Sequence, residues 1–194
     1  MAVVDARYEF LYVDVGTNGR VSDGGVWKGC SLKTAIERKI LELPEPAQLP
    51  QSNKTAPFVF VADDAFPLKP YMLKPFCFRS QTDEQRIFSY RLSRARRTVE
   101  NAFGILANRF RVLLHPINLE PAKVEKIVLA CVVLHNLLRR EKPDIYTPAG
   151  SLDSEELQTK TIVLGSWQAQ STTAAANAIS LDIGRSQGSS SIIL

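Results

Sequence analysis

One stretch of the chain carries the clearest hydrophobic pattern. Between Arg86 and Arg111, apolar residues recur in alternating steps of four and three, which is the period of an α-helix. A second stripe, made mainly of polar and small side chains, runs beside the apolar one. The apolar stripe consists of Phe88, Leu92, Ala95, Val99, Ala102, Leu106 and Phe110, and the second stripe of Ser93, Arg97, Glu100, Gly104 and Ala107. The pattern predicts one long amphipathic helix.

Glu100 is the carboxylate of the second stripe, and it lies among arginines. An ordinary role would be an ion pair within the helix to Arg96 or Arg97, worth about 0.2–0.5 kcal/mol. A carboxylate that follows its arginine is the weaker order of such a pair, which mildly favours a further role. Gly104 lies one turn on, and glycine costs about 1 kcal/mol relative to alanine inside a helix. We therefore expect another part of the chain to approach the helix closely at Gly104.

Strand patterns come at the start of the chain. Residues Ala2–Asp5 and Glu9–Gly16 are rich in β-branched and aromatic side chains, and a short turn separates them. They predict two paired strands. After a glycine-rich turn, Ser22 or Asp23 can cap a helix that is predicted over Val26–Leu41.

Further along the chain the patterns alternate between helical and irregular. Leu113–Leu119 reads as a short extended segment, and Pro121–Arg140 as a second long helix that begins with proline. The middle of that helix, Ile127–Leu138, is apolar nearly all round, which is typical of a buried helix. Ser151–Leu164 has a weak helical pattern. Ser171–Leu194 is rich in Ser, Ala, Gly and Thr and predicts a disordered tail.

A second informative stretch is the apolar run Phe58–Ala62, which Asp63 and Asp64 follow directly. Such a run predicts a strand buried on both faces, as in the centre of an α/β sheet. In open α/β sheets the ligand crevice lies outside the carboxyl ends of the strands. Asp63 is therefore placed where a functional carboxylate is expected. One of the two aspartates would otherwise cap the following turn, and Asp64 is the better candidate for that role.

The distribution of charge says more than the composition. The chain has 194 residues, of which 45% are hydrophobic and 23% charged, as expected for a globular protein with one sizeable core plus a tail. The net charge is only +4, but five arginines fall between Arg86 and Arg97. Clustered arginines suit a polyanionic partner. A merely solvated basic face explains the cluster equally well.

Cysteine and histidine usage excludes several kinds of site. Cys30, Cys77 and Cys131 are far apart and odd in number, so neither a disulfide framework nor a cysteine zinc site is indicated, and a reducing compartment fits. His115 and His135 lack metal-ligand spacing, and His135 lies in an apolar helix, which favours a hydrogen-bonded core residue. No apolar run is long enough to span a bilayer, and the first residues do not resemble a signal peptide.

Four segments form a recognisable series along the chain. They are VVDARYEFLYVDVGTNGRVSDGGVW, VADDAFPLKPYML, SRARRTVENAFGILANRFRVL and IVLACVVLHNLL. This series resembles the DDE superfamily endonucleases, and more closely the PIF/Harbinger transposases and the host proteins derived from them. The resemblance covers roughly the first three-quarters of the chain. Asp23 matches a recurrent aspartate of the family outside its catalytic acids, and helix capping also accounts for it.

The resemblance implies a ribonuclease H-like α/β fold, in which a mixed sheet is flanked by helices. It implies a partial DDE endonuclease domain at residues 1–146 and a weakly ordered extension and tail at residues 147–194. In the family, three acidic residues bind two divalent metals. Asp63 matches the second acid and Glu100 the third. The family's first acid lies on the first strand of the sheet, which would precede this chain, and Asp5 fits the family's second strand better than the first.

The same resemblance implies an enzyme that cuts or transfers DNA phosphodiester bonds. Its cofactor would be Mg²⁺ or Mn²⁺ held by Asp63 and Glu100, since Mg²⁺ prefers oxygen ligands. Arginines around Glu100 would contact DNA phosphates, an interaction that is sequence-independent and salt-sensitive. These arginines are Arg91, Arg94, Arg96 and Arg97.

Partners follow from the resemblance as well. Family members commonly depend on a separate Myb-like protein for DNA binding, so such a partner and a nuclear location are implied. Because the first acid is expected to be missing, two alternatives stay open beside the enzyme. One is a catalytically inactive derivative that binds DNA or a protein, and the other is an incomplete gene product that is not stable alone.

Overall fold

The computed structural model describes residues 1–17, 21–156, 161–169 and 191–193, which form a mixed α/β fold. The helices are α1 (Asp23–Gly29), α2 (Ser31–Glu37), α3 (Asp83–Arg109), the 3₁₀-helix η1 (Arg111–Leu114), α4 (Pro121–Glu141), α5 (Pro143–Tyr146) and α6 (Ser166–Ala169). The strands are β1 (Ala2–Val4), β2 (Phe10–Val13), β3 (Ala47–Gln48), β4 (Thr55–Ala56), β5 (Phe60–Val61), β6 (Met72–Leu73), β7 (Ser154–Glu156), β8 (Thr161–Val163) and β9 (Ser191–Ile193).

The main sheet has the strand order β2-β1-β9-β5-β6. β1 pairs antiparallel with β2 and parallel with β9, whereas β5 pairs antiparallel with β9 and parallel with β6. β9 therefore joins a half-sheet from the start of the chain to a half-sheet from its middle. The predicted mixed α/β class and the predicted pairing of the first two strands are confirmed. The ribonuclease H-like topology is implied only by family resemblance.

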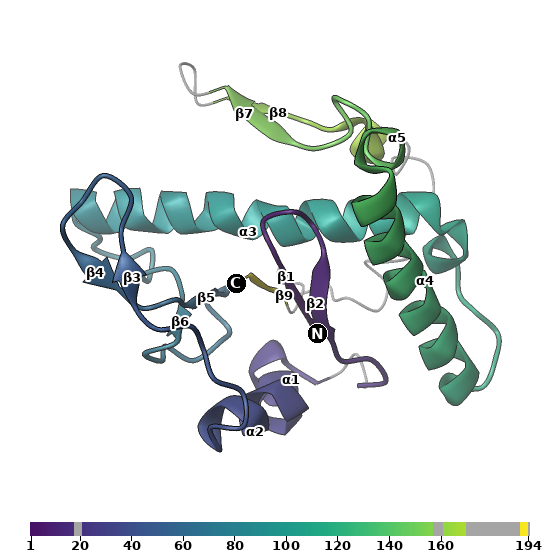
Figure 1. Ribbon diagram of the computed structural model, residues 1–194, viewed down its shortest axis with the longest axis horizontal. Helices are drawn as coiled ribbons and strands as arrows, with labels where there is room; N and C mark the ends of the chain where they lie inside the picture. The colour runs from purple at the N-terminus through teal and green to yellow at the C-terminus, as the bar shows by residue number, and fades with distance from the viewer. Residues whose placement is uncertain (18–20, 157–160, 170–190, 194) are drawn as a thin grey trace.

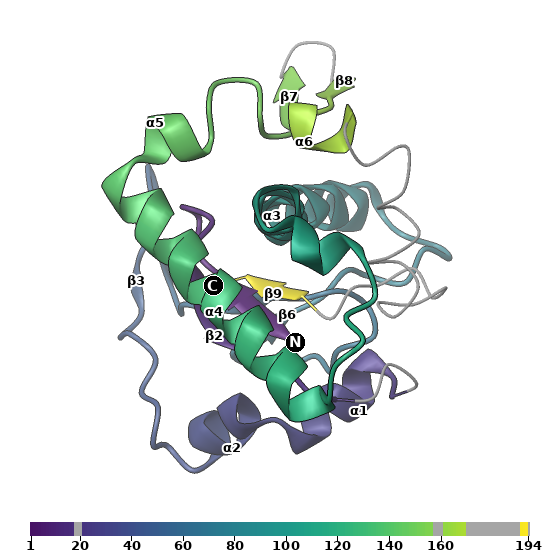
Figure 2. The same ribbon diagram turned by 90° about the vertical axis from the view of Figure 1, so that its right-hand side faces the viewer.

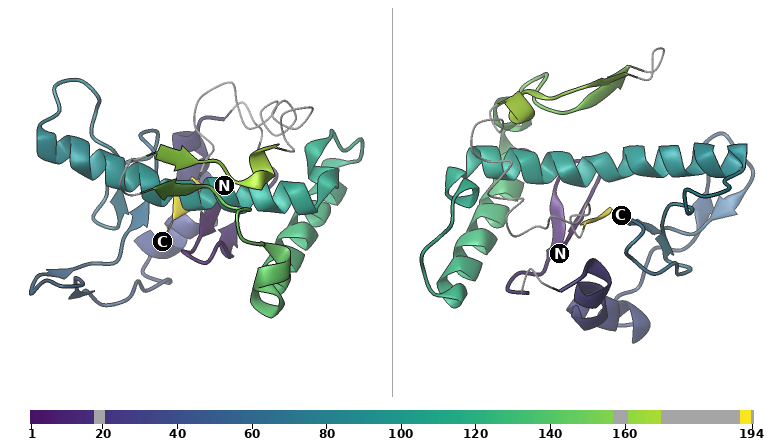
Figure 3. Two further views of the ribbon diagram at one scale, coloured as in Figure 1. Left: turned by 90° about the horizontal axis from the view of Figure 1, so that it is seen from above. Right: turned by 180° about the vertical axis from the view of Figure 1, so that it is seen from behind.

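The elements stack in layers around α3, the longest helix (Figure 1). The strands lie on one side of α3 with α1 and α2 beyond them, and the β7–β8 hairpin lies on the other side of α3 (Figures 1 and 2). Seen from above, the hairpin runs over α3 (Figure 3, left). α4 crosses the end of this arrangement near the C-terminal half of α3, so both faces of α3 are partly covered by other elements.

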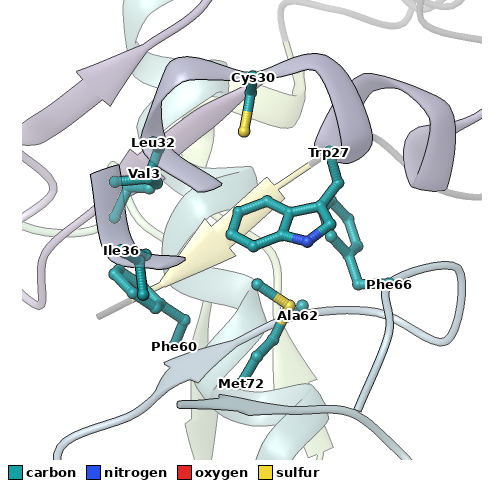
Figure 4. Close-up of a cluster of buried hydrophobic side chains, with 9 residues drawn as sticks. All are labelled: Val3, Trp27, Cys30, Leu32, Ile36, Phe60, Ala62, Phe66 and Met72. Carbon is teal, nitrogen blue, oxygen red and sulfur yellow. The ribbon is translucent and has the colours of Figure 1, made fainter. Parts of the chain in front are cut away.

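Two buried clusters lie on opposite faces of β1, because side chains alternate along a strand. Val3 points into a cluster with Trp27 and Phe66, between the sheet and α1–α2 (Figure 4). Ala2 and Val4 pack instead against α3 and α4. The first cluster is completed by Cys30, Leu32, Ile36, Phe60, Ala62 and Met72, and the second contains Phe10, Val99, Ala102, Leu106, Cys131 and Val132.

The predicted long helix is confirmed as α3, although it starts earlier than the apolar pattern suggested. Its first turn is closed by a capping box in which the Gln85 N–H donates to the Thr82 hydroxyl and the Thr82 N–H donates to the Gln85 side chain. Such a box satisfies two of the free N–H groups at a helix start. The N-terminal boundary is therefore determined by polar capping residues outside the hydrophobic stripe.

Two sequence predictions in the first half of the chain need correction. The single helix over Val26–Leu41 is wrong, because Cys30 adopts an extended conformation that ends α1 and its sulfur accepts from the Lys33 N–H to cap α2. The strand over Phe58–Ala62 is shorter than predicted and is not buried throughout. Phe58 is exposed, whereas Phe60 and Ala62 are buried.

The second long helix is confirmed as α4, but the prediction that it is buried is wrong. Only Cys131, Val132 and His135 are buried along it. His135 is a hydrogen-bonded core residue as predicted, with Nδ1 at 2.9 Å from the Tyr146 hydroxyl and Nε2 at 2.8 Å from the Tyr8 carbonyl. The opposite side of α4 faces solvent.

Later predictions fail for a shared reason. Residues 111–114 form η1 where an extended segment was predicted from Leu113, and β7 and β8 pair as a hairpin where Ser151–Leu164 was predicted to be a weak helix. Both patterns are short, so packing against α3 overrides the local preference. Most of the predicted tail lies outside the described residues, although 191–193 form β9. No helix in the described part of the chain has the length and apolarity needed to cross a membrane.

Candidate functional site

Asp63 lies two residues beyond the end of β5, and its side chain is almost completely buried, with 6% exposed. One carboxylate oxygen, Oδ1, accepts a hydrogen bond from the Ala65 N–H at 3.0 Å and so caps the turn. The other oxygen, Oδ2, is buried without a hydrogen-bond partner among the described residues. The turn-capping role predicted for Asp64 therefore belongs to Asp63, which keeps one oxygen unsatisfied.

Arg96 of α3 brings Asp63 and Glu100 together. Its Nη2 lies 3.8 Å from Asp63 Oδ2 and 3.9 Å from Glu100 Oε1, so both carboxylates approach one guanidinium nitrogen. Both distances exceed that of a charge-assisted hydrogen bond, which is about 2.7–2.9 Å. The intrahelical pair expected for Glu100 forms with Arg96, and the contact to Asp63 is additional. Two acids that are far apart in the sequence thus share one cation.

The electrostatics of Asp63 differ from those of an ordinary surface aspartate. Burial raises the pKa of Asp63, and the Arg96 guanidinium opposes that rise only in part. The nearby Asp23 and Asp64 carboxylates raise the pKa of Asp63 further. A buried carboxylate with a perturbed pKa at the end of a strand is a recognised sign of a functional site.

Asp23 is brought toward Asp63 by the packing of α1. Gly24 faces the turn after β5, where a Cβ would lie 3.1 Å from the carbonyl oxygen of Ala65. The helix start can approach this closely because Gly24 has no side chain. Ser22, not Asp23, provides the capping side chain of α1. Asp23 is therefore a third carboxylate in the neighbourhood of Asp63, a placement that its sequence position alone did not indicate.

The donor set suits a hard divalent cation in part. Asp63 and Glu100 supply carboxylate oxygens, which Mg²⁺ and Mn²⁺ prefer, and the unsatisfied Oδ2 of Asp63 is an open acceptor. Among the described residues, however, no group of three or more His, Cys, Asp or Glu side chains is close enough to hold a metal ion. Arg96 at present occupies the position between the two carboxylates.

The four arginines that were predicted to contact DNA do not share one face of α3. Arg96 turns toward Asp63, whereas Arg94 and Arg97 turn toward the hairpin on the other side of the helix and pair with Glu155 of β7. The Arg94 Nε lies 2.7 Å from Glu155 Oε2 and the Arg97 Nη1 3.7 Å from the same oxygen. Arg91 is exposed and forms no ion pair with another described residue.

Gly104 has the close neighbour that its place in a helix predicted. A Cβ at Gly104 would overlap the ring of Trp167 in α6. One turn earlier, the Asn101 side-chain oxygen accepts from Trp167 Nε1 at 2.9 Å and from the Asp153 N–H at 3.2 Å. Asn101 was not among the residues predicted from the sequence. It lies on the polar side of the helix, away from the apolar stripe, so the hydrophobic pattern carried no signal that it would be buried.

Asp5 lies away from this site. Its carboxylate accepts from the Arg7 and Glu9 N–H groups, each at 2.9 Å, and so closes the turn between β1 and β2. Because β1 runs antiparallel to β5 in the sheet, the residue after β1 and the residue after β5 lie at opposite ends of it. Asp5 is therefore a turn residue and not a third carboxylate beside Asp63.

Comparisons with known proteins place the chain in a family. Residues 1–136 match the model of the DDE superfamily endonucleases. The chain is 27% identical over 138 residues to "Protein ALP1-like" of Arabidopsis thaliana, a match that covers 71% of this chain and 34% of that protein. It is 27% identical over 161 residues to "Putative nuclease HARBI1" of Xenopus laevis, which covers 80% and 42% respectively. The chain thus spans less than half the length of these relatives, and no solved structure matches it. The matched range, residues 1–136, includes Asp63, Arg96 and Glu100. Because this match covers more than half of the chain, the chain belongs to the DDE superfamily endonucleases.

Proposed function

We propose that the chain is a Harbinger-like endonuclease domain that cuts DNA phosphodiester bonds with the help of a divalent cation. The observation that carries the proposal is the convergence of Asp63 and Glu100 on Arg96 Nη2, with Asp63 Oδ2 buried and unsatisfied. A buried carboxylate oxygen without a hydrogen bond is costly, so Oδ2 of Asp63 fits a site that a ligand completes. Family membership supports a nucleic acid as the substrate.

Asp63 and Glu100 would hold the cation, Mg²⁺ or Mn²⁺. Bound there, the cation would stabilise negative charge on the phosphate and activate the attacking water. The role of Arg96 would then depend on whether the cation is bound. Without the cation its guanidinium offsets the repulsion between the two carboxylates, and with the cation bound it becomes available to a phosphate oxygen. Asp63 must be ionised for either role, so its raised pKa predicts weaker metal binding as the pH falls.

Nicking of supercoiled plasmid DNA in Mg²⁺ or Mn²⁺ tests the proposal. Asp63→Asn removes the negative charge but keeps the oxygen that accepts from the Ala65 N–H. Glu100→Gln removes the negative charge of the second acid. Each variant should reduce nicking to the level of a protein-free control. Asp64→Asn, next to Asp63 and exposed, is the matched control and should nick like the wild type.

A second candidate function is DNA binding without cleavage, with an associated protein such as a Myb-like partner supplying sequence preference. It is favoured by one observation, namely that no cluster of three metal-ligating side chains occurs in the described part of the chain. In that case the wild type retains duplex DNA in a salt-dependent way but does not nick it. Arg94→Glu combined with Arg97→Glu should then abolish retention, whereas Asp63→Asn should not reduce it. A nuclear location would follow from either function.

A further inference from the structure

The solvent-facing side of α4 is an apolar stripe. Val133 is 65% exposed and Leu137 51% exposed, and the side chains beside them on the helix are also apolar. Contiguous exposed apolar surface of this kind marks an interaction site on a soluble protein. The stripe consists of Leu129, Ala130, Val133, Leu134, Leu137 and Leu138.

The rotation of α4 about its own axis is determined by polar contacts on its other side. Asn136 makes two hydrogen bonds to the backbone of Phe10, one from the Phe10 N–H at 2.9 Å and one to its carbonyl at 2.8 Å. His135, buried beside it, contacts the Tyr8 carbonyl. Turning α4 to bury the stripe would break these bonds and expose a buried imidazole. The apolar stripe is therefore a stable surface of this fold.

The ends of the stripe carry opposite charges. Lys126 lies two turns before Val133, and Glu141 lies one turn after Leu137, so both charges fall on the side of the helix that carries the stripe. Both side chains are exposed, and neither forms an ion pair with another described residue. The stripe thus has a positive end, an apolar middle and a negative end (Figure 1 shows α4 at the edge of the molecule).

This order is complementary to itself when a second copy of the helix runs antiparallel. A two-fold axis that passes between Val133 and Leu134 places each side chain of the stripe opposite a side chain of the second helix that is complementary to it in charge or apolar character. The opposed pairs are Lys126 with Glu141, Leu129 with Leu138, Ala130 with Leu137, and Val133 with Leu134. Small Ala130 opposite large Leu137 allows the helices to interdigitate. A parallel pair would instead bring like charges together.

We propose that the chain forms a symmetric homodimer through the antiparallel contact of α4 with α4 of a second copy. A two-fold interface requires one surface to match itself, and the charge order of α4 meets that requirement. Antiparallel helices also place opposite ends of their dipoles together. The occupant of the stripe is therefore another copy of this chain, and its recognition rests on the Lys126–Glu141 pairs at both ends and on the apolar middle.

Sedimentation equilibrium of the whole chain at rising protein concentration tests the dimer. The wild type should pass from monomer to dimer, and Leu137→Glu should weaken dimerisation by about 100-fold or more, because it buries an unpaired charge. Ile40→Glu, which alters an apolar side chain that is 73% exposed on another part of the surface, is the control and should dimerise normally. A wild type that stays monomeric throughout, or a Leu137→Glu variant that dimerises normally, overturns the proposal.

Charge exchange tests the antiparallel arrangement itself. Lys126→Glu and Glu141→Lys each turn both end contacts into repulsions and should weaken dimerisation by about 10-fold. An equal mixture of the two variants should form a heterodimer as tight as the wild type, because every end contact is then again between opposite charges. The double variant should likewise regain wild-type dimerisation. If neither the mixture nor the double variant recovers, the antiparallel pairing is wrong. Circular dichroism confirms that each variant stays folded.

Discussion

Two buried carboxylates lie on opposite sides of α3, and both contact its arginines. Glu155 meets Arg94 at 2.7 Å and also receives a hydrogen bond from the Tyr90 hydroxyl. Asp63 meets Arg96 only at 3.8 Å. Each carboxylate keeps one buried oxygen without a hydrogen bond among the described residues, Oε2 of Glu155 and Oδ2 of Asp63. Their side chains are 4% and 6% exposed, so burial does not distinguish them either. The difference lies in the distance from each carboxylate to its nearest arginine.

That difference separates a structural role from a functional one. A buried carboxylate close to two arginines holds elements together, and Glu155 holds the β7–β8 hairpin against α3 in this way. A buried carboxylate with a distant counter-charge lowers stability, and such groups are retained mainly where chemistry needs them. The comparison thus assigns the hairpin side of α3 to docking and the Asp63 side to the candidate site.

Glu155→Gln is expected to have the largest effect on stability. The change leaves Arg94 and Arg97 without their counter-charge, and breaking a buried pair costs about 3–5 kcal/mol. Because Arg94 is partly exposed, we expect a loss of about 1–3 kcal/mol in the free energy of unfolding, measured by urea denaturation. Glu45→Gln, at an exposed loop position, is the control and should change little.

The same variant also tests whether Glu155 competes with DNA phosphates for the two arginines. If the arginines bind DNA, Glu155→Gln should retain duplex DNA more tightly than the wild type at low salt. Equal retention by both proteins would show that Arg94 and Arg97 serve only to dock the hairpin.

Gly104→Ala should have an intermediate effect, on the same side of α3. A methyl group there meets the Trp167 ring, and overpacking costs about 1–3 kcal/mol, less about 1 kcal/mol gained in helix propensity. Because Trp27, the other tryptophan, is buried, iodide quenching reports on Trp167, and we expect the quenching to rise. Gly29→Ala, where a Cβ meets open space, is the matched control. Unchanged quenching in Gly104→Ala would contradict the docking of α6 at this position.

Asp63→Asn should have the smallest effect on stability, and in the opposite direction. Because burial raises the pKa of Asp63, the folded protein binds this proton more tightly than the unfolded chain does. Stability is therefore lost as the pH rises from the ordinary aspartate pKa through the raised one. Asp63→Asn should be slightly more stable than the wild type at neutral pH, and the gain should disappear below the ordinary aspartate pKa. Thermal denaturation across pH measures this difference, and a variant less stable at neutral pH would assign Asp63 a structural role.

Much of the site was predictable from short patterns in the sequence. The 3.6-residue period identified α3, the apolar run identified the strand before Asp63, and the glycine inside a helix indicated a close neighbour at Gly104. The family resemblance selected Asp63 and Glu100 and is confirmed by the match over residues 1–136. The helix period, the apolar run and the glycine are local patterns, so the sequence shows them without knowledge of how the elements pack.

Sequence patterns alone therefore identify the two long helices, the first strand pair, a strand before Asp63 that is shorter in the structure, and the family. The tertiary structure alone decided that Arg96 lies between Asp63 and Glu100, that Glu155 pairs with Arg94, and that one side of α4 stays exposed. An apolar pattern gives the period of an element but not what covers each of its faces. Contacts between distant residues depend on how the elements pack, and no local pattern records that packing.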